Sequence, residues 1–431
     1  MIIGAHQNSR KGLIHMGFEP VEGCEPFFLN DSWVSPLNFH PEVRSKMNLP
    51  SKVLIHDVTL RDGEQMAGVV FTEDEKVAIA LELDKLGIPL IEIGTPAVSE
   101  EDQRAFKRLA KMKLKAKKIA LARIMEEDVK LAAECGADGL FYETGINPYF
   151  VKYVLGLDSK EFIQRIIKGA KLAKELGLFV EFCGWDTFRI NNLEWIKTVY
   201  TELLRNVEVD QIGISDTLGQ AHPFTVNFLV RKMKEWFPSV PLAVHVHNDY
   251  GLATATALMA IASGAEAVET SFNCLGERTG NAATEEVVMG VEMILGIKTG
   301  IDCSGLYRVS KLIQEISKVS VAPNKPIVGD RIFHSESGIV IDANEKLRKA
   351  TGFDYCMFPY NPKITNRDVT YVAGKKSGRA YVRHFLEREG IMASEAQVDE
   401  ILIRIKKQGI VLKNFLPDEE VKRIVESVLG K

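Results

Sequence analysis

The sequence predicts an α/β protein built on a (β/α)8 TIM barrel, with a mostly helical C-terminal subdomain and an ordered N-terminal extension. From residue 53 to about residue 297, short apolar or β-branched runs alternate with amphipathic stretches, which is the pattern of βα units. Eight such runs are present, and eight is the strand number of a TIM barrel. No GxGxxG turn follows the first run, so a doubly wound open sheet ranks second.

The predicted strands are short and rich in Val, Ile, Leu or Phe, and they cover residues 53–57, 90–93, 118–122, 139–143, 178–183, 210–214, 241–247 and 266–271. A helix is predicted over residues 72–86, where Thr72 is a suitable N-cap followed by acidic residues. Similar helical stretches fill the other gaps. Glycine adopts the left-handed conformation that closes a helix, and the predicted closing glycines are Gly87, Gly136, Gly177 and Gly264.

The chain of 431 residues is long enough for one large domain and a smaller appendage. We assign residues 1–50 to the N-terminal extension, 51–300 to the barrel, and 301–431 to a C-terminal linker and helical subdomain. The extension contains EPFFLNDSWVSPLNFHP, whose aromatic residues favour an ordered segment packed on the main body.

The composition excludes several classes of protein. The net charge is −4 with interleaved charges, and no basic block or basic-aromatic face predicts nucleic-acid binding. No apolar run approaches the roughly 20 residues of a membrane span, and the N-terminus lacks a secretory apolar region. The 6 cysteines form no CxxC pair, which favours reduced thiols and a cytoplasmic location. The expected partners are small molecules or further copies of the chain.

Two histidines end the seventh predicted strand, in the sequence HVHND. His245 and His247 are two positions apart, so on a strand both imidazoles point the same way. In a barrel they face the mouth formed by the C-terminal strand ends, where reactive groups lie. Taken by itself, this motif could equally be two histidines that form hydrogen bonds in the polar rim of the barrel. The first strand, however, runs into HDVTLRDGEQ, which brings Asp62 to the same mouth.

One carboxylate with two imidazoles suits a divalent metal ion, with positions left open for substrate. The donor types accept Mn, Mg, Co, Zn or Fe. Asn281, in NCLGERTGNAATEE after the eighth strand, is a candidate further ligand, and the glycines of that stretch allow the backbone to come close. Arg61 is a fixed cation suited to an oxyanion, although it could also serve only as a partner for nearby carboxylates.

The motifs TLRDGEQ, HVHND and GERTGNAATEE, in this order and at these strand ends, resemble the metal-dependent TIM-barrel synthases that make isopropylmalate, homocitrate, citramalate and, in the Re-type enzyme, citrate. The lyase for hydroxymethylglutaryl-CoA is a more distant branch. The resemblance is good from residue 53 to about residue 295. It continues more weakly through FHSESGIVIDA and VAGKKSGRAYV in the C-terminal region.

The resemblance implies an acyltransferase that joins acetyl-CoA to a 2-oxo acid, with conversion of the acyl group into an alkyl group. Asp62, His245 and His247 would bind the metal, with Asn281 as the candidate fourth ligand. Arg61 would stabilise the alkoxide that develops on the 2-oxo acid. The residues implied to bind substrate are Arg61, Gln65, Glu92, Arg123 and Thr217; for Thr217, a cap of the following turn is an equal alternative. A homodimer is also implied.

Two positions depart from the family pattern. Val340 stands where the synthases have an acid/base histidine, and Trp185 stands where a glutamate is expected. Another group could serve instead, and the candidate catalytic residues of that segment are His334, Glu336 and Tyr355. Alternatively, the proton chemistry was rebuilt in a sub-branch with a different acceptor, or the barrel binds metal but no longer condenses.

The 2-oxo acids that this family uses as acceptors differ in the group attached beyond the ketone, so the residues that face this group decide the substrate. Arg123 favours a second carboxylate, unless it pairs with Glu126 or Glu127, and Glu181 stands where the homocitrate branch has an arginine. The chain ends before a leucine-sensing domain of the kind that full isopropylmalate synthases carry. The first prediction is therefore oxaloacetate with acetyl-CoA, giving citrate and CoA. Homocitrate, citramalate or isopropylmalate synthesis, an acyl-CoA lyase and a non-catalytic metal-binding barrel are the alternatives.

Overall fold

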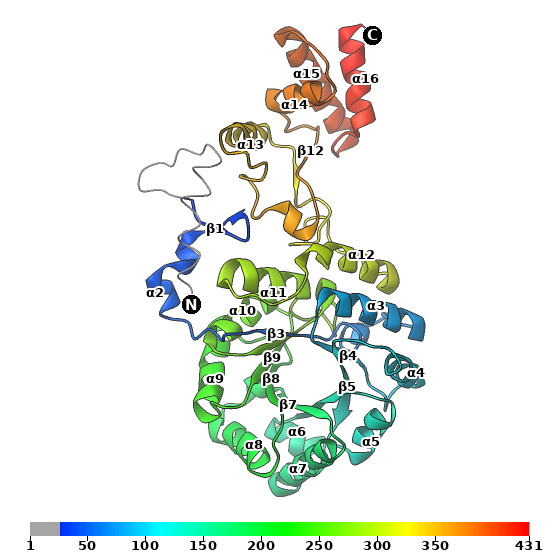
Figure 1. Cartoon of the computed structure of the whole chain (residues 1–431), viewed down its shortest axis with the longest axis vertical. Helices are drawn as coiled ribbons and strands as arrows, with labels where there is room; N and C mark the ends of the chain where they lie inside the picture. Colours follow the sequence, from blue (N-terminus) through cyan, green and yellow to red (C-terminus); the bar gives the residue numbers. More distant parts are fainter. Residues whose placement is uncertain (1–25, 431) are drawn as a thin grey trace. The chain divides into compact units, whose positions relative to one another are not determined.

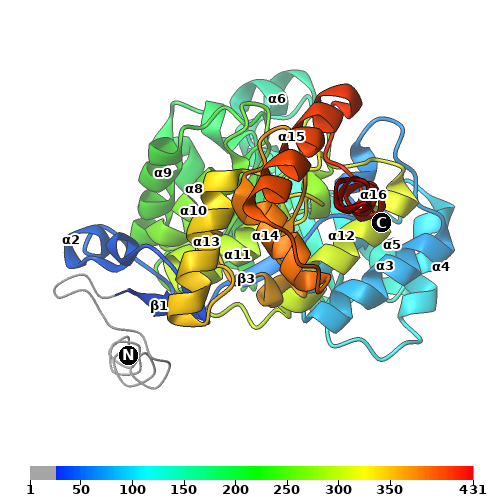
Figure 2. The same ribbon diagram turned by 90° about the horizontal axis from the view of Figure 1, so that it is seen from above.

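The computed structural model describes residues 26–430, which divide into two compact units. The barrel unit comprises Leu37–Ala322 and Pro326–Val328. The C-terminal unit comprises Pro323–Lys325, the residues from Gly329 onward, and the described residues before Leu37. Figures 1 and 2 colour the chain from blue to red along the sequence. The part of the predicted N-terminal extension that covers residues 1–25 lies outside the described residues.

Eight parallel strands close into a barrel, and neighbouring strands follow chain order. The ring closes where β10 pairs with β3, with Thr270 opposite Asp57. The strands are β3 (Leu54–Asp57), β4 (Leu90–Gly94), β5 (Lys117–Arg123), β6 (Gly139–Gly145), β7 (Phe179–Trp185), β8 (Gln211–Asp216), β9 (Leu242–Val246) and β10 (Ala267–Thr270). The predicted TIM barrel is confirmed, and each predicted strand overlaps an observed one.

The helices that follow the strands form the outer ring seen in Figure 1. They are α3 (Glu73–Leu86), α4 (Glu100–Leu109), α5 (Glu126–Glu134), α6 (Pro148–Tyr153), α7 (Ser159–Glu175), α8 (Leu193–Asn206), α9 (Pro223–Trp236), α10 (Ala253–Ser263) and α11 (Thr284–Gly290). A short α2 (Pro41–Arg44) precedes the barrel, and α12 (Leu306–Ser317) follows it. The helices of this ring bury apolar residues such as Ile79 of α3, Val129 of α5 and Val226 of α9, and together they shield the parallel strands from water as such sheets require.

The helix boundaries agree with the signals in the sequence. The side chain of Thr72 accepts a hydrogen bond from the amide of Glu75, and Glu75 bonds back to the amide of Thr72, which makes a capping box at the start of α3. The four glycines predicted to close helices all have positive φ: Gly87, Gly136, Gly177 and Gly264. Because glycine has no Cβ, it adopts this conformation without strain.

The inside of the barrel contains apolar and ionisable side chains together. A cluster of Leu90, Ile119, Leu121, Phe141 and Cys183 is buried within the ring. Polar side chains on β3, β4, β7, β8 and β10 are also almost fully buried, and they are His56, Glu92, Glu181, Gln211 and Glu269. Burying an ionisable group is costly unless it is paired, and His56, Glu92, Glu181 and Glu269 all have polar partners inside the barrel.

The C-terminal unit contains α13 (Gly338–Thr351), α14 (Arg379–Arg388), α15 (Glu395–Leu412), α16 (Asp418–Leu429) and the parallel pair β11 (His334–Ser335) and β12 (Thr370–Tyr371), drawn in yellow to red in Figures 1 and 2. Its core is formed by apolar residues that include Ile341, Phe385 and Ile401. The hairpin of β1 (Phe28–Leu29) and β2 (Ser32–Trp33) belongs to this unit, and the Phe28 ring lies 5.2 Å from that of Phe353.

None of the helices between residues 26 and 430 has both the length and the apolar character that a bilayer span needs. The described cysteines form no disulfide within that range; they are Cys135, Cys183, Cys274, Cys303 and Cys356.

Candidate active site

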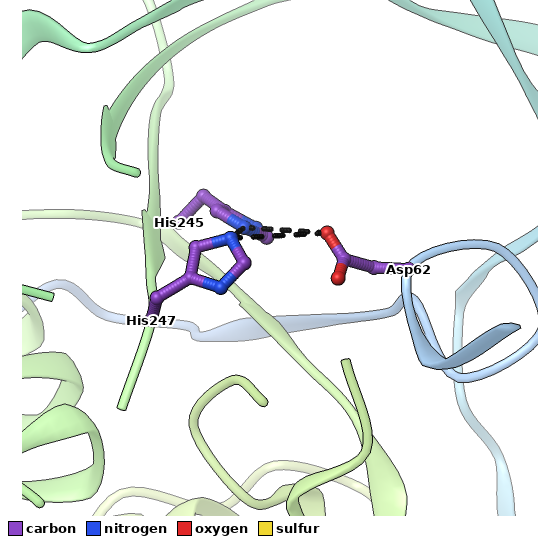
Figure 3. Close-up of side chains that lie close together, drawn as sticks. All are labelled: Asp62, His245 and His247. Carbon is purple, nitrogen blue, oxygen red and sulfur yellow. Dashed lines mark hydrogen bonds and ion pairs between the residues drawn. The ribbon is translucent and has the colours of Figure 1, made fainter. Parts of the chain in front are cut away.

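Asp62, His245 and His247 converge at the mouth of the barrel (Figure 3). His245 lies on β9, His247 follows it, and Asp62 lies in the turn after β3. The Nε2 atoms of the two histidines are 3.0 Å apart. The Oδ2 atom of Asp62 lies 3.7 Å from Nε2 of His245 and 3.9 Å from Nε2 of His247. The structure thus brings together the three residues predicted to bind a metal.

The protonation states leave these atoms available as ligands. Nδ1 of His245 lies 2.9 Å from Oε2 of Glu269, so the proton of the neutral ring belongs on Nδ1 and the lone pair of Nε2 points to the site. Burial lowers the pKa of both His245 and His247 to about 4. Burial opposes ionisation of Asp62, but the charge of Arg61 and the two imidazoles hold its pKa well below the usual range.

The donor set fits a divalent cation. The candidate ligand atoms lie within 4.8 Å of one another, and the spacings of 3.0, 3.7 and 3.9 Å fall between those of adjacent and opposite ligands about 2.1 Å from a metal. The backbone of Asn281 forms an isolated antiparallel β-bridge with that of His247. The buried side-chain Oδ1 of Asn281 has no hydrogen-bond partner among residues 26–430. An orphaned buried oxygen beside two imidazoles and a carboxylate is what a further ligand requires.

The GERTG loop is held close to the metal site. The amide of Glu277 donates a hydrogen bond to Oδ1 of Asp62 over 3.0 Å. A Cβ on Gly276 would lie 3.0 Å from that same oxygen, and a Cβ on Gly280 would lie 1.6 Å from the carbonyl oxygen of Cys274. The close backbone approach predicted from these glycines is confirmed. Other side chains would push the loop away from Asp62.

Arg278 of this loop joins three loops at the mouth. Its Nε donates to Oδ1 of Asp249 over 2.9 Å, and its Nη2 donates to the carbonyl of Thr217 over 2.5 Å. Thr217 itself accepts a hydrogen bond at Oγ1 from the amide of Asp186 over 2.8 Å. The hydroxyl of Thr217 therefore tethers the loop after β7 rather than capping its own turn. The substrate role predicted for Thr217 stays a prediction.

Arg61 is fixed by acidic neighbours. Its Nε donates to Oε2 of Glu92 over 2.6 Å, and its Nη1 donates to Oδ2 of Asp62 over 2.8 Å and to Gln65 over 3.4 Å. Its guanidinium carbon lies 5.1 Å from the centre of the Phe141 ring. Burial alone would lower the pKa of Arg61, but Glu92 and Asp62 raise it. A permanent positive charge in one orientation thus lies beside the candidate metal ligands, and Glu92 and Gln65 help to hold the guanidinium in place.

A second buried network adjoins the candidate metal site through Glu269, and the sequence analysis did not predict it. Nδ1 of His56 lies 3.1 Å from Oε2 of Glu181, which also accepts a hydrogen bond from Gln211 over 2.8 Å. Burial opposes protonation of His56, but the hydrogen bond and charge of Glu181 raise its pKa to about 9. Burial and the charge of Glu181 raise the pKa of Glu269 well above its usual range.

His56, Glu181 and Glu269 have the spacing of a metal site. A protonated imidazole has no lone pair to offer, so the ring acts as a cation between carboxylates. Ionisable residues in the middle of apolar strands, in LIHD, LIEI, LFVEFC and EAVETS, were the signal that could have revealed this network.

Arg123 lies at the end of β5 with a partner of its own. Its Nε and Nη2 donate to the carboxylate of Asp128 over 2.7 and 3.0 Å, and 55% of its side chain is exposed. The sequence left pairing with Glu126 or Glu127 open, whereas the partner is Asp128, the third residue of α5. The fork of the guanidinium is therefore largely occupied.

The other predicted catalytic residues belong to the C-terminal unit. His334 lies on β11 with its ring edge-on to Phe415 at 5.7 Å. Glu336 accepts a hydrogen bond from the amide of Lys376 over 2.8 Å. The hydroxyl of Tyr355 donates to the carbonyl of Asp31. These contacts are structural, and the catalytic roles of His334, Glu336 and Tyr355 stay predictions.

Residues 52–313 match the model of the HMGL-like family. The chain belongs to the HMGL-like family. A putative (R)-citramalate synthase from Archaeoglobus fulgidus is 40% identical over 383 residues, which are 88% of this chain and 76% of that protein. A 2-isopropylmalate synthase from Methanocaldococcus jannaschii is 37% identical and covers 89% of this chain and 73% of its own. A homocitrate synthase from Methanopyrus kandleri is 36% identical over 90% of this chain and 95% of that protein.

A solved structure shares the family fold. The HMG-CoA lyase of Bacillus subtilis superposes with a TM-score of 0.58 at 22% identity, covering 64% of this chain and 97% of that one. At this identity the likeness shows the fold alone. Together with the synthase relatives, family membership makes the protein an enzyme, an acyltransferase of the synthase type.

Proposed function

We propose that this enzyme condenses acetyl-CoA with a 2-oxo acid that chelates a divalent cation. The convergence of Asp62, His245 and His247 at the barrel mouth carries the proposal. Asn281 would be the fourth ligand, and the metal would be Mn²⁺, Mg²⁺, Co²⁺ or Zn²⁺. The similarity to citramalate, isopropylmalate and homocitrate synthases supports the same reaction class. When bound, the cation would polarise the ketone of the acceptor as a Lewis acid.

The residues of the chain account for the rest of the chemistry. Arg61, held by Glu92 and Asp62, points a fixed positive charge to the mouth, where it stabilises the negative charge that develops on the ketone oxygen. Glu269 orients His245 through Nδ1 and keeps Nε2 free. Arg278 keeps the GERTG loop against Asp249. Because these groups are ordered by their own hydrogen bonds, they need little reorganisation during the reaction.

Oxaloacetate is the proposed acceptor, and citrate the product. Arg123 supports this choice because its pairing with Asp128 uses Nε and Nη2, so Nη1 at the end of β5 can donate to a second carboxylate. Glu181 argues against 2-oxoglutarate, because this buried acid, bound to His56 and Gln211, stands where the resemblance would have an arginine. Pyruvate, giving citramalate, is the second candidate. Its support is the pairing of Arg123 with Asp128 and the name of the relative from Archaeoglobus.

The acceptor is tested by mixing the full chain with Mn²⁺ or Mg²⁺, acetyl-CoA and one 2-oxo acid at a time, and following free CoA with a thiol reagent. We expect the highest kcat/KM with oxaloacetate among oxaloacetate, pyruvate, 2-oxoglutarate and 2-oxoisovalerate. Because oxaloacetate decarboxylates to pyruvate in the presence of divalent ions, the product must also be identified by mass spectrometry as citrate or citramalate. A chelator should stop the reaction.

The other possible results of this assay each point to a different function. A preference for pyruvate supports the second candidate and overturns the first. A lyase would show neither CoA release nor a condensed product with any 2-oxo acid. It would instead release acetyl-CoA from the acyl-CoA that such a condensation would form. If the metal binds and no acceptor releases CoA, the synthase function is wrong and the barrel is a binding protein.

A further inference from the structure

The proposed condensation needs a group that removes a methyl proton from acetyl-CoA. The position at the end of β7 cannot supply one, because Trp185 stands there. Its ring packs edge-on against Phe150 with centroids 4.4 Å apart and lies over Gly145. Val340, in the first turn of α13, carries no exchangeable proton either. A base for this reaction must therefore be a residue other than these two.

Glu143 is a carboxylate on β6 that points to the barrel interior. It lies two residues after Phe141, so on the strand both side chains point the same way. The ring of Phe141 is buried inside the barrel and faces Arg61 at 5.1 Å. Glu143 is one step nearer the C-terminal strand ends, in register with Arg123 of β5 and Cys183 of β7. It therefore lies above Phe141, in the layer that borders the mouth.

Glu143 differs from the other acids of the interior in having no fixed partner. Glu92 is bound to Arg61, Glu181 to His56, and Glu269 to His245. Within residues 26–430, the carboxylate of Glu143 makes no hydrogen bond and no ion pair within 4.0 Å. A partly buried carboxylate left unpaired in a site crowded with paired ones is poorly explained by stability, because pairing would compensate its desolvation.

The barrel geometry also sets Glu143 across the mouth from the metal ligands. The ring order is β10-β3-β4-β5-β6-β7-β8-β9, so β6 stands opposite β10, and two strands separate it from β9 on one side and from β3 on the other. A 2-oxo acid held by Asp62, His245 and His247 would occupy the space between. A second substrate that reaches this acceptor from the β6 side would meet Glu143.

We propose that Glu143 is the general base that takes the methyl proton of acetyl-CoA, an inference that rests on the proposed function. The C–H bond breaks, its electron pair forms the enolate double bond, and the proton forms an O–H bond on the Glu143 carboxylate. The enolate carbon then bonds to the ketone carbon of the acceptor, and the ketone π electrons move to its oxygen beside Arg61. Glu143 returns its proton to that oxygen. Water hydrolyses the thioester, which releases CoA and leaves a carboxylate.

The charges around Glu143 suit this exchange of a proton. Burial raises the pKa of the Glu143 carboxyl to about 7, the positive charge of Arg61 opposes the rise, and the negative charges of Glu92 and Asp62 add to it. Arg123 on the neighbouring strand is already paired with Asp128, and Cys183 on the other side is a buried thiol whose own pKa is raised. A carboxylate that both gains and loses a proton near neutral pH works efficiently in both directions.

The test replaces Glu143 by glutamine, which keeps the size and removes the basic oxygen. We expect Glu143→Gln to lower kcat roughly 100-fold to 10,000-fold, the range of general acid–base effects. KM for the 2-oxo acid and the affinity for Mn²⁺ in titration calorimetry should change less than about threefold, since Glu143 is not a metal ligand in this scheme. Glu143→Asp should keep partial turnover.

A kinetic isotope effect separates catalysis from structure. With trideuteroacetyl-CoA, Glu143→Asp should show a larger primary isotope effect on kcat than the unaltered enzyme, because a misplaced base makes proton removal rate-limiting. A purely structural role would leave that effect unchanged. Glu175→Gln, at the exposed end of α7, is the matched control and should behave like the unaltered enzyme.

Failure of this inference is distinct from failure of the proposed function. If the unaltered enzyme releases CoA with a 2-oxo acid and Glu143→Gln does so within threefold, the base is another group, such as one from the C-terminal unit, and the inference is overturned. An unchanged isotope effect in Glu143→Asp would overturn it as well. If the unaltered enzyme releases no CoA with any acceptor, the proposed function fails first.

Discussion

Replacing Asp62 with alanine is expected to abolish retention of the divalent cation and, with it, turnover. Asp62 supplies the anionic ligand, while His245 and His247 are neutral because burial lowers the pKa of both to about 4. Removing even an outer hydrogen-bond partner of a ligand costs about 10-fold to 100-fold in metal affinity, so loss of the charged ligand should cost more. The variant also frees Arg61 and the amide of Glu277 from their shared acceptor.

Two measurements check this expectation independently. Metal content after gel filtration, determined by elemental analysis, should fall below one tenth of that of the unaltered enzyme, and CoA release should fall with it. Asp74→Ala is the matched control, because this aspartate lies on the outside of α3 with 83% of its side chain exposed. Metal binding and turnover near the unaltered level in Asp62→Ala would contradict the assigned site.

The barrel and the metal ligands could be predicted from the sequence because local signals encode them. Strand runs and helix periods repeat along the chain, and glycines such as Gly87 close helices whatever lies around them. His245 and His247 share a strand, so their common direction follows from the strand period alone. The meeting with Asp62 required only the assumption that all strand ends of a barrel share one mouth.

The contacts between distant strands could not be predicted in this way. His56 and Glu181 lie 125 residues apart, and nothing local to either shows that they pair inside the barrel. The pairing of Arg123 with Asp128 instead of Glu126 or Glu127 depends on how α5 begins after β5, which a sequence pattern does not resolve. Glu143 could have been noted as an acid at a strand end. That it has no partner becomes visible only when the structure shows which residues pair with the other buried acids.

Replacing Lys76 with methionine is expected to destabilise the barrel unit by about 3–5 kcal/mol, the usual cost of breaking a buried ion pair. The side chain of Lys76 is almost completely buried in α3. Its Nζ lies 2.7 Å from Oε2 of Glu64 and 2.5 Å from Oδ1 of Asp102. It also donates to the carbonyls of Leu60 and Ile93 over 3.1 and 3.0 Å. Methionine keeps the length but leaves two carboxylates and two carbonyls without this partner.

The same substitution should affect activity, because Lys76 connects the TLRDGEQ turn to the end of β4. Leu60 and Glu64 flank Arg61 and Asp62 in that turn, so loss of the ammonium group loosens both the guanidinium and the carboxylate of the proposed site. Urea unfolding followed by circular dichroism gives the change in free energy, and calorimetry with Mn²⁺ gives the change in affinity. We expect weaker binding of the metal in Lys76→Met even at temperatures where the protein stays folded.

Two further variants separate the charge from the volume of Lys76. Lys85→Met, also on α3 but with 65% of its side chain exposed and an ion pair with Glu82, should change stability by less than about 0.5 kcal/mol. Adding Asp102→Asn to Lys76→Met should recover part of the loss, because a neutral amide is less costly to bury than an unpaired carboxylate, and its oxygen can still accept from the amide of Thr95. If Lys76→Met costs less than about 1 kcal/mol, or the second substitution makes the protein less stable, the four contacts of Lys76 do not act as a buried charge network.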